Sequence, residues 1–323
     1  MSVSRRDLLR MAGFGTAALM LPEGLAACRT GKSQQEPRSP QLDPDLERLT
    51  SWTATLQQRK LGGPGTPLGR RAIGVGELAV GTPYEAFTLE TYLRAGGNPS
   101  QEPLTLSLTR FDCVTLVESC LAVARLTGDD GPPTWERFGR EIQRMRYRGG
   151  ERRGYSSRLH YFSEWITDGD LRGLVRDLGP ELGGGEDARP IRFMTEHRAS
   201  YSGMVDDAVF REIEATERRL DRHPRRVIPT KRIPEVVNRL ESGDVIAFAT
   251  EITGLDVTHA AFAHRGADGV LRVLHAPLSG GAVEVTRTTL PEYVAAIRRA
   301  TGILVARPAS PVLRSPAAGH GQR

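Results

Sequence analysis

Residues 109–118 read TRFDCVTLVE and place Cys113 at the beginning of an apolar run. Beyond the cysteine, apolar side chains recur at the spacing of an α-helix. One stripe is formed by Val114, Val117, Leu121 and Ala124, and a second by Leu116, Cys120 and Val123. A helix that is apolar on two sides is buried. The segment therefore predicts a central, buried helix with Cys113 near its start.

The residues before this helix predict how it begins. Thr109 is followed three residues later by Asp112, which resembles a capping box with aspartate in place of the commoner glutamate. In the first turn, free backbone N–H groups and the positive end of the helix dipole would favour the thiolate of Cys113, which is the nucleophilic form. The alternative is a buried cysteine without chemistry, and this segment alone does not decide between the two.

The positions of the other two cysteines bear on whether Cys113 forms a disulfide. Cys120 follows Cys113 by seven residues, which is about 10.5 Å along a helix axis and beyond the roughly 7 Å that a disulfide can span. A bridge is therefore disfavoured, and we assign Cys120 to the core. The third cysteine, Cys28, belongs to the N-terminal segment.

That segment has the features of an export signal. Arg5 and Arg6 precede an apolar run at 11–21, which is typical of a twin-arginine signal and shorter than the roughly 20 residues of a membrane-spanning helix. The sequence LAAC ending at Cys28 resembles a lipobox, in which the signal is cut before the cysteine and its thiol is lipidated. Cleavage after Ala27 without lipidation is the alternative. We expect export by the twin-arginine route and a lipid anchor that leaves the protein facing the periplasm or cell envelope.

Composition suits a folded body behind this anchor, because 39% of the residues are hydrophobic and 26% are charged. We expect a signal peptide at 1–27, a tether at 28–45, a single domain at 46–307 and a disordered tail at 308–323. An arginine-rich helical insertion is expected at about 128–234. The net charge of +5 does not indicate nucleic-acid binding, because the basic residues follow no recognised module and an exported protein does not ordinarily meet that partner.

Within the insertion, helices are expected at 136–147 and 206–222, with Thr134 and Ser202 as their capping residues. The glycine-rich segment 179–190 is expected to be loop. The sheet is expected to come largely from residues 244–307 and to be antiparallel. These elements predict an α+β fold in which the Cys113 helix packs on that sheet.

Two histidines lie on a predicted hairpin of this sheet. The strand-like segments 257–264 and 270–276 are joined by the turn sequence GADG. If the hairpin is centred on Ala267, His259 and His275 are directly opposed, with their Cβ atoms about 5 Å apart on one face. The hairpin therefore predicts two adjacent imidazoles.

A cysteine, a base and an orienting group form the catalytic machinery of cysteine hydrolases. We predict Cys113 as nucleophile, His259 as base and His275 as the residue that orients it. Each histidine alone would more often be an ordinary core or surface residue. A metal site made of the three is the competing alternative, but the usual short-spaced ligand pairs are absent from the sequence. We expect neither a metal nor a cofactor.

These motifs resemble NlpC-type cell-wall peptidases, whose fold is papain-like. The segments FDCVTLVE at 111–118, SRLHYFSEWI at 157–166 and GLDVTH at 254–259 are more closely similar to the N-acetylmuramoyl-L-alanine amidase-like branch, and the similarity extends over about 79–308. One departure is that the commoner Asp-Cys-Ser-Gly is DCVT here. Because that serine helps typical NlpC-type enzymes to bind the free amine of a stem peptide, their endopeptidase specificity does not simply transfer.

The resemblance implies peptidoglycan or its muropeptide fragments as substrate. Arg158 is the preferred ligand for a substrate carboxylate, since guanidinium binds carboxylate bidentately. His160 and Tyr161 are expected to line the cleft, and the alternative is that they pack in the interior. Asp112 is expected to bind a substrate amine, and the alternative is that it only caps the helix. Tyr84, from the similarity of GTPY to the start of the NlpC-type core, is expected near the catalytic pair.

Together these observations predict a cysteine-dependent amidohydrolase that acts on peptidoglycan, as an amidase or a stem-peptide endopeptidase. Two alternatives stay open. One is a non-catalytic lipoprotein that binds cell-wall peptides, and the other is a papain-like acyltransferase that acts on lipid.

Overall fold

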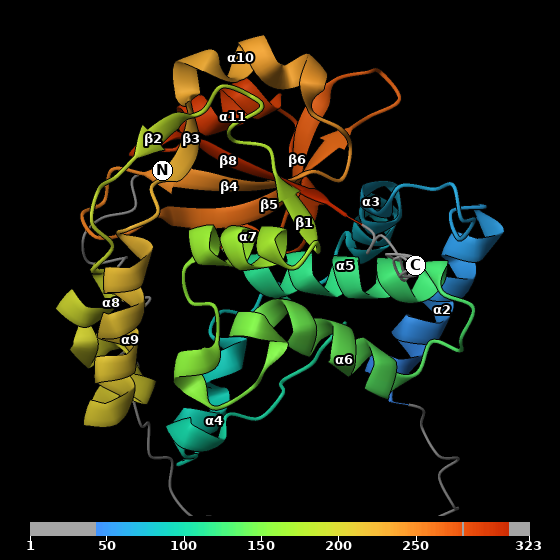
Figure 1. The fold of residues 1–323 in the computed structure, drawn as a ribbon. Coiled ribbons are helices and arrows are strands. Elements are labelled where there is room, and N and C mark those ends of the chain that lie inside the picture. Colours follow the sequence, from blue (N-terminus) through green and yellow to red (C-terminus); the bar gives the residue numbers. More distant parts are fainter. Residues whose placement is uncertain (1–42, 280, 310–323) are drawn as a thin grey trace, which may run out of the picture.

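The computed structural model describes residues 43–279 and 281–309, in which helices lie on both faces of one antiparallel sheet (Figure 1). The sheet has the strand order β2-β3-β8-β4-β5-β6-β7, with β1 paired to β8. Its strands are β1 (Val175–Asp177), β2 (Gly185–Asp187), β3 (Arg225–Pro229), β4 (Val245–Thr250), β5 (Val257–Arg265), β6 (Leu271–His275), β7 (Glu284–Val285) and β8 (Ala300–Pro308). This arrangement confirms the expected α+β class and the antiparallel pairing.

Helices make up most of the remaining structure. The α-helices are α2 (Pro44–Gln58), α3 (Leu68–Ala79), α4 (Thr91–Arg94), α5 (Cys113–Gly128), α6 (Trp135–Arg146), α7 (Phe162–Leu171), α8 (Phe193–Glu196), α9 (Asp207–Leu220), α10 (Ile233–Val236) and α11 (Leu290–Ala296). Short 3-10 turns are η1 (Thr88–Glu90), η2 (Pro99–Gln101), η3 (Arg148–Gly150), η4 (Tyr155–Ser157), η5 (Arg198–Ser200), η6 (Ser202–Val205), η7 (Thr230–Arg232) and η8 (Val237–Arg239).

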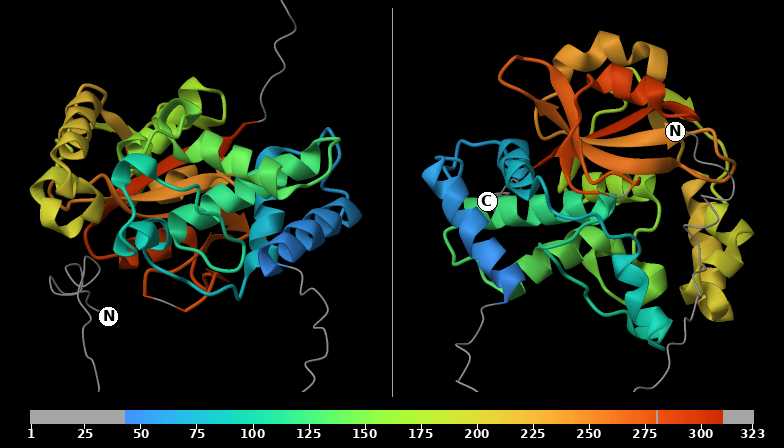
Figure 2. Two further views of the ribbon diagram at one scale, coloured as in Figure 1. Left: turned by 90° about the horizontal axis from the view of Figure 1, so that it is seen from below. Right: turned by 180° about the vertical axis from the view of Figure 1, so that it is seen from behind.

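The sheet separates two hydrophobic cores, because successive side chains of its central strands point to opposite faces. In β4, Val245 and Ala247 face the layer of α2, α3 and α5, whereas Ile246 and Phe248 face the layer of α10 and α11. The right-hand view of Figure 2 shows the sheet between these helical layers. Because the side-chain period of a strand is two residues, an apolar run buried on both faces fits a central strand.

Helix α5 is the buried helix that the sequence predicts, and all of its residues from Thr115 to Thr127 are buried. Its N-cap is Asp112, whose Oδ1 accepts hydrogen bonds from the backbone N–H groups of Val114 and Thr115. The Thr115 hydroxyl accepts from the Asp112 backbone N–H and completes the capping box. The expected box from Thr109 to Asp112 is therefore wrong by three residues, because Asp112 is itself the cap.

The middle of the chain is only partly as expected. Helices α6 and α9 confirm the two predicted helices, and Thr134 caps α6. The predicted cap Ser202 is wrong, since Asp206 accepts the backbone N–H groups at the start of α9. The segment also adds β1, β2 and β3 to the sheet, so it is not purely helical, and β2 lies within the expected loop 179–190.

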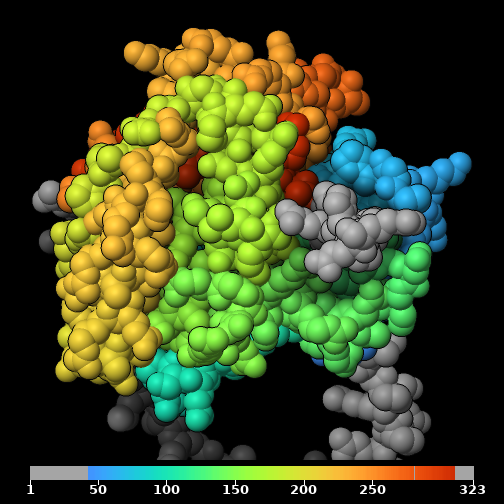
Figure 3. Space-filling model, in the orientation of Figure 1, coloured from blue at the N-terminus to red at the C-terminus, as the bar shows by residue number. Residues whose placement is uncertain are grey.

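Figure 3 shows one face of the molecule covered largely by this middle part of the chain, with only small areas of the red C-terminal strand visible. Among the described residues, no helix is both long and apolar enough to cross a bilayer. The expected twin-arginine signal and Cys28 lie outside the described residues, as does most of the expected tail, whose first residue Pro308 ends β8.

Candidate active site

His259 and His275 lie side by side, but not in the expected register. Strands β5 and β6 pair Phe262 with Leu274, which centres the hairpin one residue beyond Ala267 and leaves His259 diagonal to His275. The direct opposition was wrong because Arg265 pairs with Leu271, so the connecting loop runs over 266–270 and lies one residue further along the chain than the predicted strands imply. A displacement of two residues keeps both side chains on one face. His259 Nε2 lies 2.8 Å from His275 Nδ1.

Aromatic rings enclose this pair on the α11 side of the sheet. The Phe248 ring stacks on His259 at 5.6 Å between centroids, and Tyr293 of α11 packs edge-on to His275 at 5.2 Å. Burial lowers the pKa of both imidazoles, that of His259 to about 3. The pair is therefore uncharged near neutral pH, and His259 Nδ1 has no hydrogen-bond partner among the described residues.

Cys113 is the first residue of α5 and is partly exposed. The backbone N–H of Ala260, the residue after His259, is directed at the thiol and would stabilise its thiolate. The thiolate charge would also raise the pKa of Tyr84 and of Tyr293. The thiol therefore lies where α5 begins against β5, within electrostatic reach of the tyrosine that contacts His275.

The expected lowering of the Cys113 pKa is not what the structure gives. Burial, and after it the neighbouring Asp112 carboxylate, raise the pKa of the thiol to about 12. Three backbone N–H groups, those of Ala260, Val114 and Cys113, oppose this rise and are outweighed. The resting state is thus a neutral thiol beside a neutral imidazole pair.

The structure places two of the predicted binding residues beside the thiol. Oδ1 of Asp112 accepts the hydrogen bonds of the helix cap, and the Thr88 hydroxyl donates to its Oδ2 at 3.5 Å. Tyr84 is half-buried, and its strand-like backbone pairs with Phe111, two residues before the cysteine. Both residues adjoin Cys113, and their roles toward substrate stay predictions.

The other three lie in a buried network of their own. Arg158 is ion-paired with Glu90, lies 3.7 Å from Glu102 and stacks over the Tyr155 ring at 4.9 Å. His160 Nε2 lies 2.8 Å from the Tyr155 carbonyl oxygen.

Tyr161 is buried, donates to Glu217 at 2.6 Å and accepts from the Met194 backbone N–H. These contacts favour packing for His160 and Tyr161. Internal carboxylates already neutralise Arg158, so its role as a substrate ligand stays a prediction that the contacts do not favour.

Two side chains at the site were missed in the sequence. Glu284 of β7 has Oε1 3.5 Å from His275 Nε2, and the Tyr293 hydroxyl lies 3.4 Å from His275 Nδ1. Glu284 belongs to a strand of only two residues, which leaves too little alternation for a sequence pattern. Tyr293 could have been found only by knowing that α11 crosses this end of the sheet.

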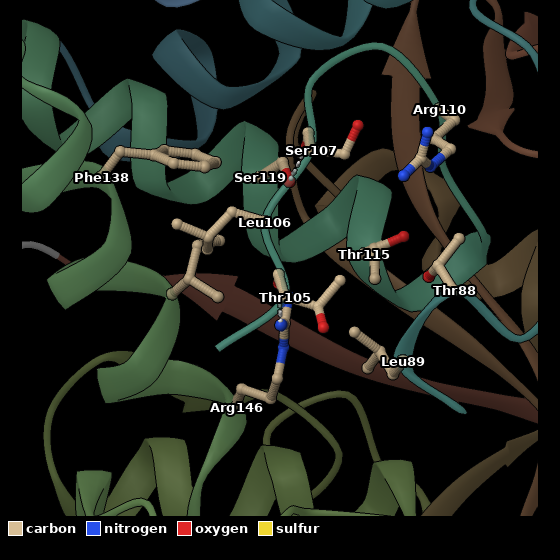
Figure 4. A pocket seen from close by; sticks show the side chains of 11 residues that line it. Thr88, Leu89, Thr105, Leu106, Ser107, Arg110, Thr115, Ser119, Phe138 and Arg146 are labelled. Carbon is tan, nitrogen blue, oxygen red and sulfur yellow. Dashed lines mark hydrogen bonds between the residues drawn. The ribbon is translucent and has the colours of Figure 1, made fainter. Parts of the chain in front are cut away.

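A pocket lies beside the same end of α5, where Figure 4 shows Thr115 and Ser119 with Thr88, Arg110 and Arg146 around it. Through Thr88 and Thr115 it adjoins Asp112, but neither Cys113 nor the histidines line it. The pocket is therefore a neighbour of the site. Among the described residues, no three His, Cys, Asp or Glu side chains are grouped so that they could hold a metal ion.

Comparisons with known proteins agree with this fold. Two crystal structures of an N-acetylmuramoyl-L-alanine amidase from Bacteroides uniformis match with TM-scores of 0.68 and 0.69 at 27% and 28% identity, each covering 75% of this chain and 99% of the other. A protein from Bacteroides fragilis, proposed to be a xylanase, matches with a TM-score of 0.63 at 31% identity, covering 72% of this chain and 99% of that one. No curated protein matches the chain.

A sequence model of the N-acetylmuramoyl-L-alanine amidase-like (AmiA-like) family matches residues 74–303. This segment contains Cys113, His259 and His275 and most of the sheet. The chain belongs to the N-acetylmuramoyl-L-alanine amidase-like family.

Proposed function

We propose that this protein is a cysteine-dependent amidohydrolase of peptidoglycan, with the amide between N-acetylmuramic acid and L-alanine as its preferred bond. Membership of the amidase-like family supports the substrate class. The observation that carries the cysteine mechanism is the buried pair of His259 and His275, with His259 Nδ1 left without a partner next to the strand residue that faces Cys113. The fold is proposed to be of the papain-like NlpC type.

The proposed reaction begins from uncharged groups. As Cys113 Sγ bonds to the amide carbon, its proton passes to His259 Nδ1, so that no free thiolate has to accumulate. His259 then gives this proton to the amine nitrogen, the carbon–nitrogen bond breaks and a thioester is left. Water adds to the thioester while His259 accepts its proton, and the acid product leaves as the thiol is restored.

Backbone groups of α5 and β5 are suited to the charge that develops. The N–H groups of Cys113, Val114 and Ala260 are directed at the sulfur position in the resting protein. The amide of Cys113, in the first turn of α5, is proposed to donate to the oxyanion. Asp112, Tyr84 and Arg158 are proposed to contact the substrate, with Arg158 the least accessible of them.

The test uses purified mature protein and peptidoglycan sacculi. Mass spectrometry of the released fragments should show sugar separated from peptide, since this separation distinguishes an amidase from an endopeptidase. Cys113→Ala should release at least 100-fold less, which is the lower range for loss of an essential catalytic group. Cys120→Ala is the matched control, because that thiol is buried in the core and should be dispensable for chemistry. Equal release by the wild type and Cys113→Ala would refute the proposal.

A module that binds cell-wall peptides without cleaving them is the second candidate, and the raised pKa of Cys113 is the observation that favours it. It predicts that the wild type and Cys113→Ala sediment equally with sacculi and that neither releases fragments. Measuring binding and release on the same samples separates the two functions.

Export and anchoring are part of the proposal. The paired arginines and the LAAC sequence support twin-arginine export and a lipid on Cys28 that holds the enzyme at the cell envelope. Mass spectrometry of the mature N-terminal peptide should find a diacylglycerol on Cys28 in the wild type. Cys28→Ala should be recovered in the soluble fraction instead of the membrane fraction. An unmodified Cys28 peptide would refute the anchor.

A further inference from the structure

We propose that Glu284 is a positioning residue that fixes the tautomers of the histidine pair and so makes Nδ1 of His259 the proton acceptor. This inference rests on the proposed function for its catalytic consequence, but its structural content can be tested without activity. It concerns a residue that touches neither the thiol nor the reacting amide.

Strand pairing places Glu284 at the histidine pair. The register of β6 and β7 sets Glu284 directly opposite His275, and its Oε1 lies 3.5 Å from His275 Nε2. His275 is 2% exposed, and its Nε2 makes no hydrogen bond of good geometry among the described residues, so the Glu284 carboxylate at 3.5 Å is the charged group that approaches it. A buried ring nitrogen needs a partner, so the carboxylate is the group that satisfies it.

A carboxylate only accepts hydrogen bonds, so it selects the form of His275 that carries its proton on Nε2. Nδ1 of His275 is then an acceptor, and at 2.8 Å it must accept a hydrogen bond from the protonated Nε2 of His259. This leaves Nδ1 of His259 without a proton. The same nitrogen has no partner among the described residues, which is what a base awaiting the thiol proton requires.

The remaining groups around His275 agree with this assignment. The hydroxyl of Tyr293, which α11 brings to 3.4 Å from Nδ1, can donate to that acceptor alongside His259. Glu284 is the charged group facing the ring from β7, and it raises the His275 pKa against the lowering by burial. With the opposite tautomer, the Nδ1 proton of His275 would point at His259 Nε2, and an unprotonated Nε2 would face the carboxylate.

The assignment has a consequence for the charged intermediate. When His259 accepts the thiol proton, the positive charge is shared along its hydrogen bond to His275 and lies near the Glu284 carboxylate. No proton has to reach Glu284, as its charge alone stabilises the imidazolium. The side chain is 58% exposed, so this effect is screened by water and should be moderate.

The experiment compares the wild type with Glu284→Ala and Glu284→Gln in long-range ¹H–¹⁵N correlation spectra of the histidine rings. The wild type should show both His259 and His275 protonated on Nε2. Glu284→Ala should show protonated Nδ1 on both rings, in part or completely. Glu284→Gln retains an acceptor oxygen and should keep the wild-type tautomers. Unchanged tautomers in Glu284→Ala would overturn the proposal.

A matched control is offered by a second histidine–carboxylate pair, whose histidine lies on β5, the strand that also carries His259. His264 Nε2 lies 3.1 Å from Glu77 Oε1, away from the cysteine. Glu77→Gln should leave the spectra of His259 and His275 unchanged. A change in those rings in this control would show that the tautomers respond to any loss of charge, and would also overturn the proposal.

Kinetics provide the second readout. Glu284→Ala should lower kcat about tenfold with KM within about twofold, and the acid limb of its pH profile should move to lower pH, because the imidazoles lose a stabilising charge. An unchanged kcat in Glu284→Ala with altered tautomers would overturn the catalytic part alone. If neither the wild type nor the variants release fragments, the proposed function fails, whereas the tautomer comparison still decides the role of Glu284.

Discussion

Two sets of groups act in opposite directions on the ionisation of the Cys113 thiol. Its position at the start of α5 directs backbone N–H groups at the sulfur, and these favour the thiolate. Burial and the Asp112 carboxylate oppose them and raise the pKa of the thiol to about 12. Since Asp112 is also the N-cap of α5, one side chain both starts the helix and disfavours ionisation of its first residue. In the proposed mechanism, Cys113 therefore depends on the neighbouring imidazole for activation.

Asp112→Asn separates these two roles, because asparagine is an equally good N-cap but carries no charge. We expect alkylation of Cys113 by iodoacetamide at pH 8 to be about threefold faster or more, which corresponds to a fall in thiol pKa of about half a unit. Peptide mass spectrometry would follow Cys113 separately from Cys120. Asp206→Asn makes the same change at the N-cap of α9, far along the chain, and should leave the rate unchanged. Equal rates in wild type and Asp112→Asn would contradict the expectation.

His259 should make the stability of the protein depend on pH. Its folded pKa of about 3 lies below the unfolded value near 6.5, so the unfolded chain binds the extra proton between these values. Stability from this residue is therefore complete above about pH 6.5 and is lost as the pH falls toward 3. Lowering the pH from 7 to 4.5 should cost about 2 kcal/mol through this residue.

His259→Gln removes that titration, so its free energy of unfolding should fall less than that of the wild type over the same interval in urea denaturation. Buried carboxyl groups with raised pKa, among them Glu102 and Glu118, act in the opposite direction in both proteins. The difference between the two proteins isolates His259. An identical pH dependence would show that this imidazole is not held neutral by burial.

At the scale of elements, a buried ion pair connects α5, the helix that begins at Cys113, to α6. Arg146 Nε lies 2.7 Å from Glu118 Oε2, with the two side chains 3% and 1% exposed. Arg146 also donates to the Thr105 carbonyl oxygen, which ties the segment before α5 to the same point. A buried pair of this kind contributes little over an apolar substitute, but either charge alone is very unfavourable.

Arg146→Met should therefore lower the free energy of unfolding by roughly 3–5 kcal/mol, because Glu118 is left buried without its partner. Adding Glu118→Gln should recover part of this loss. Arg59→Met is the control, since Arg59 pairs with Glu77 where both side chains are 45% exposed, and it should change stability by no more than about 1 kcal/mol. Denaturant titration measures all four proteins. A small effect of Arg146→Met would indicate that Glu118 is protonated in the folded state.

At the scale of the whole molecule, a residue of one segment caps a helix that lies far away from it in the sequence. Helix α7 has no side-chain cap of its own at Tyr161. Asp256, which precedes β5, supplies it by accepting from the Ser163 backbone N–H at 2.8 Å, and it also accepts from Val257. This carboxylate is 1% exposed and lies three residues before His259. The middle of the chain is thus fixed directly to β5, the strand that bears His259.

Asp256→Ala should lower the free energy of unfolding by roughly 2 kcal/mol or more, because two buried N–H donors lose their acceptor. It should also lower peptidoglycan release, as the start of β5 is no longer held. Asp43→Ala removes a cap at the exposed start of α2 and should cost only about 1 kcal/mol without affecting release. Thermal unfolding and fragment release would be measured on the same preparations. Equal effects of the two substitutions would contradict the coupling.

The predicted fold depended on patterns that are local. The apolar stripes after Cys113 were enough for a buried helix, and the strand-like segments and turn sequences after Asp244 were enough for an antiparallel sheet. The short strands β1 and β2 were missed since three residues carry too little pattern to separate a strand from a loop. Their strand character comes from pairing with β8 and β3, which lie far away in the sequence.

For the candidate site, the sequence by itself determined which residue types are available and that Cys113 would begin a buried helix while His259 and His275 would share a sheet face. Only the tertiary structure decided the diagonal register of the histidines, the contacts of His275 with Glu284 and Tyr293, and the burial that raises the thiol pKa. The physical reason is how far along the chain the interactions that set each property extend. Helix and strand periodicity are set by neighbours along the chain, whereas loop length, desolvation and pairing between distant strands depend on the packed molecule.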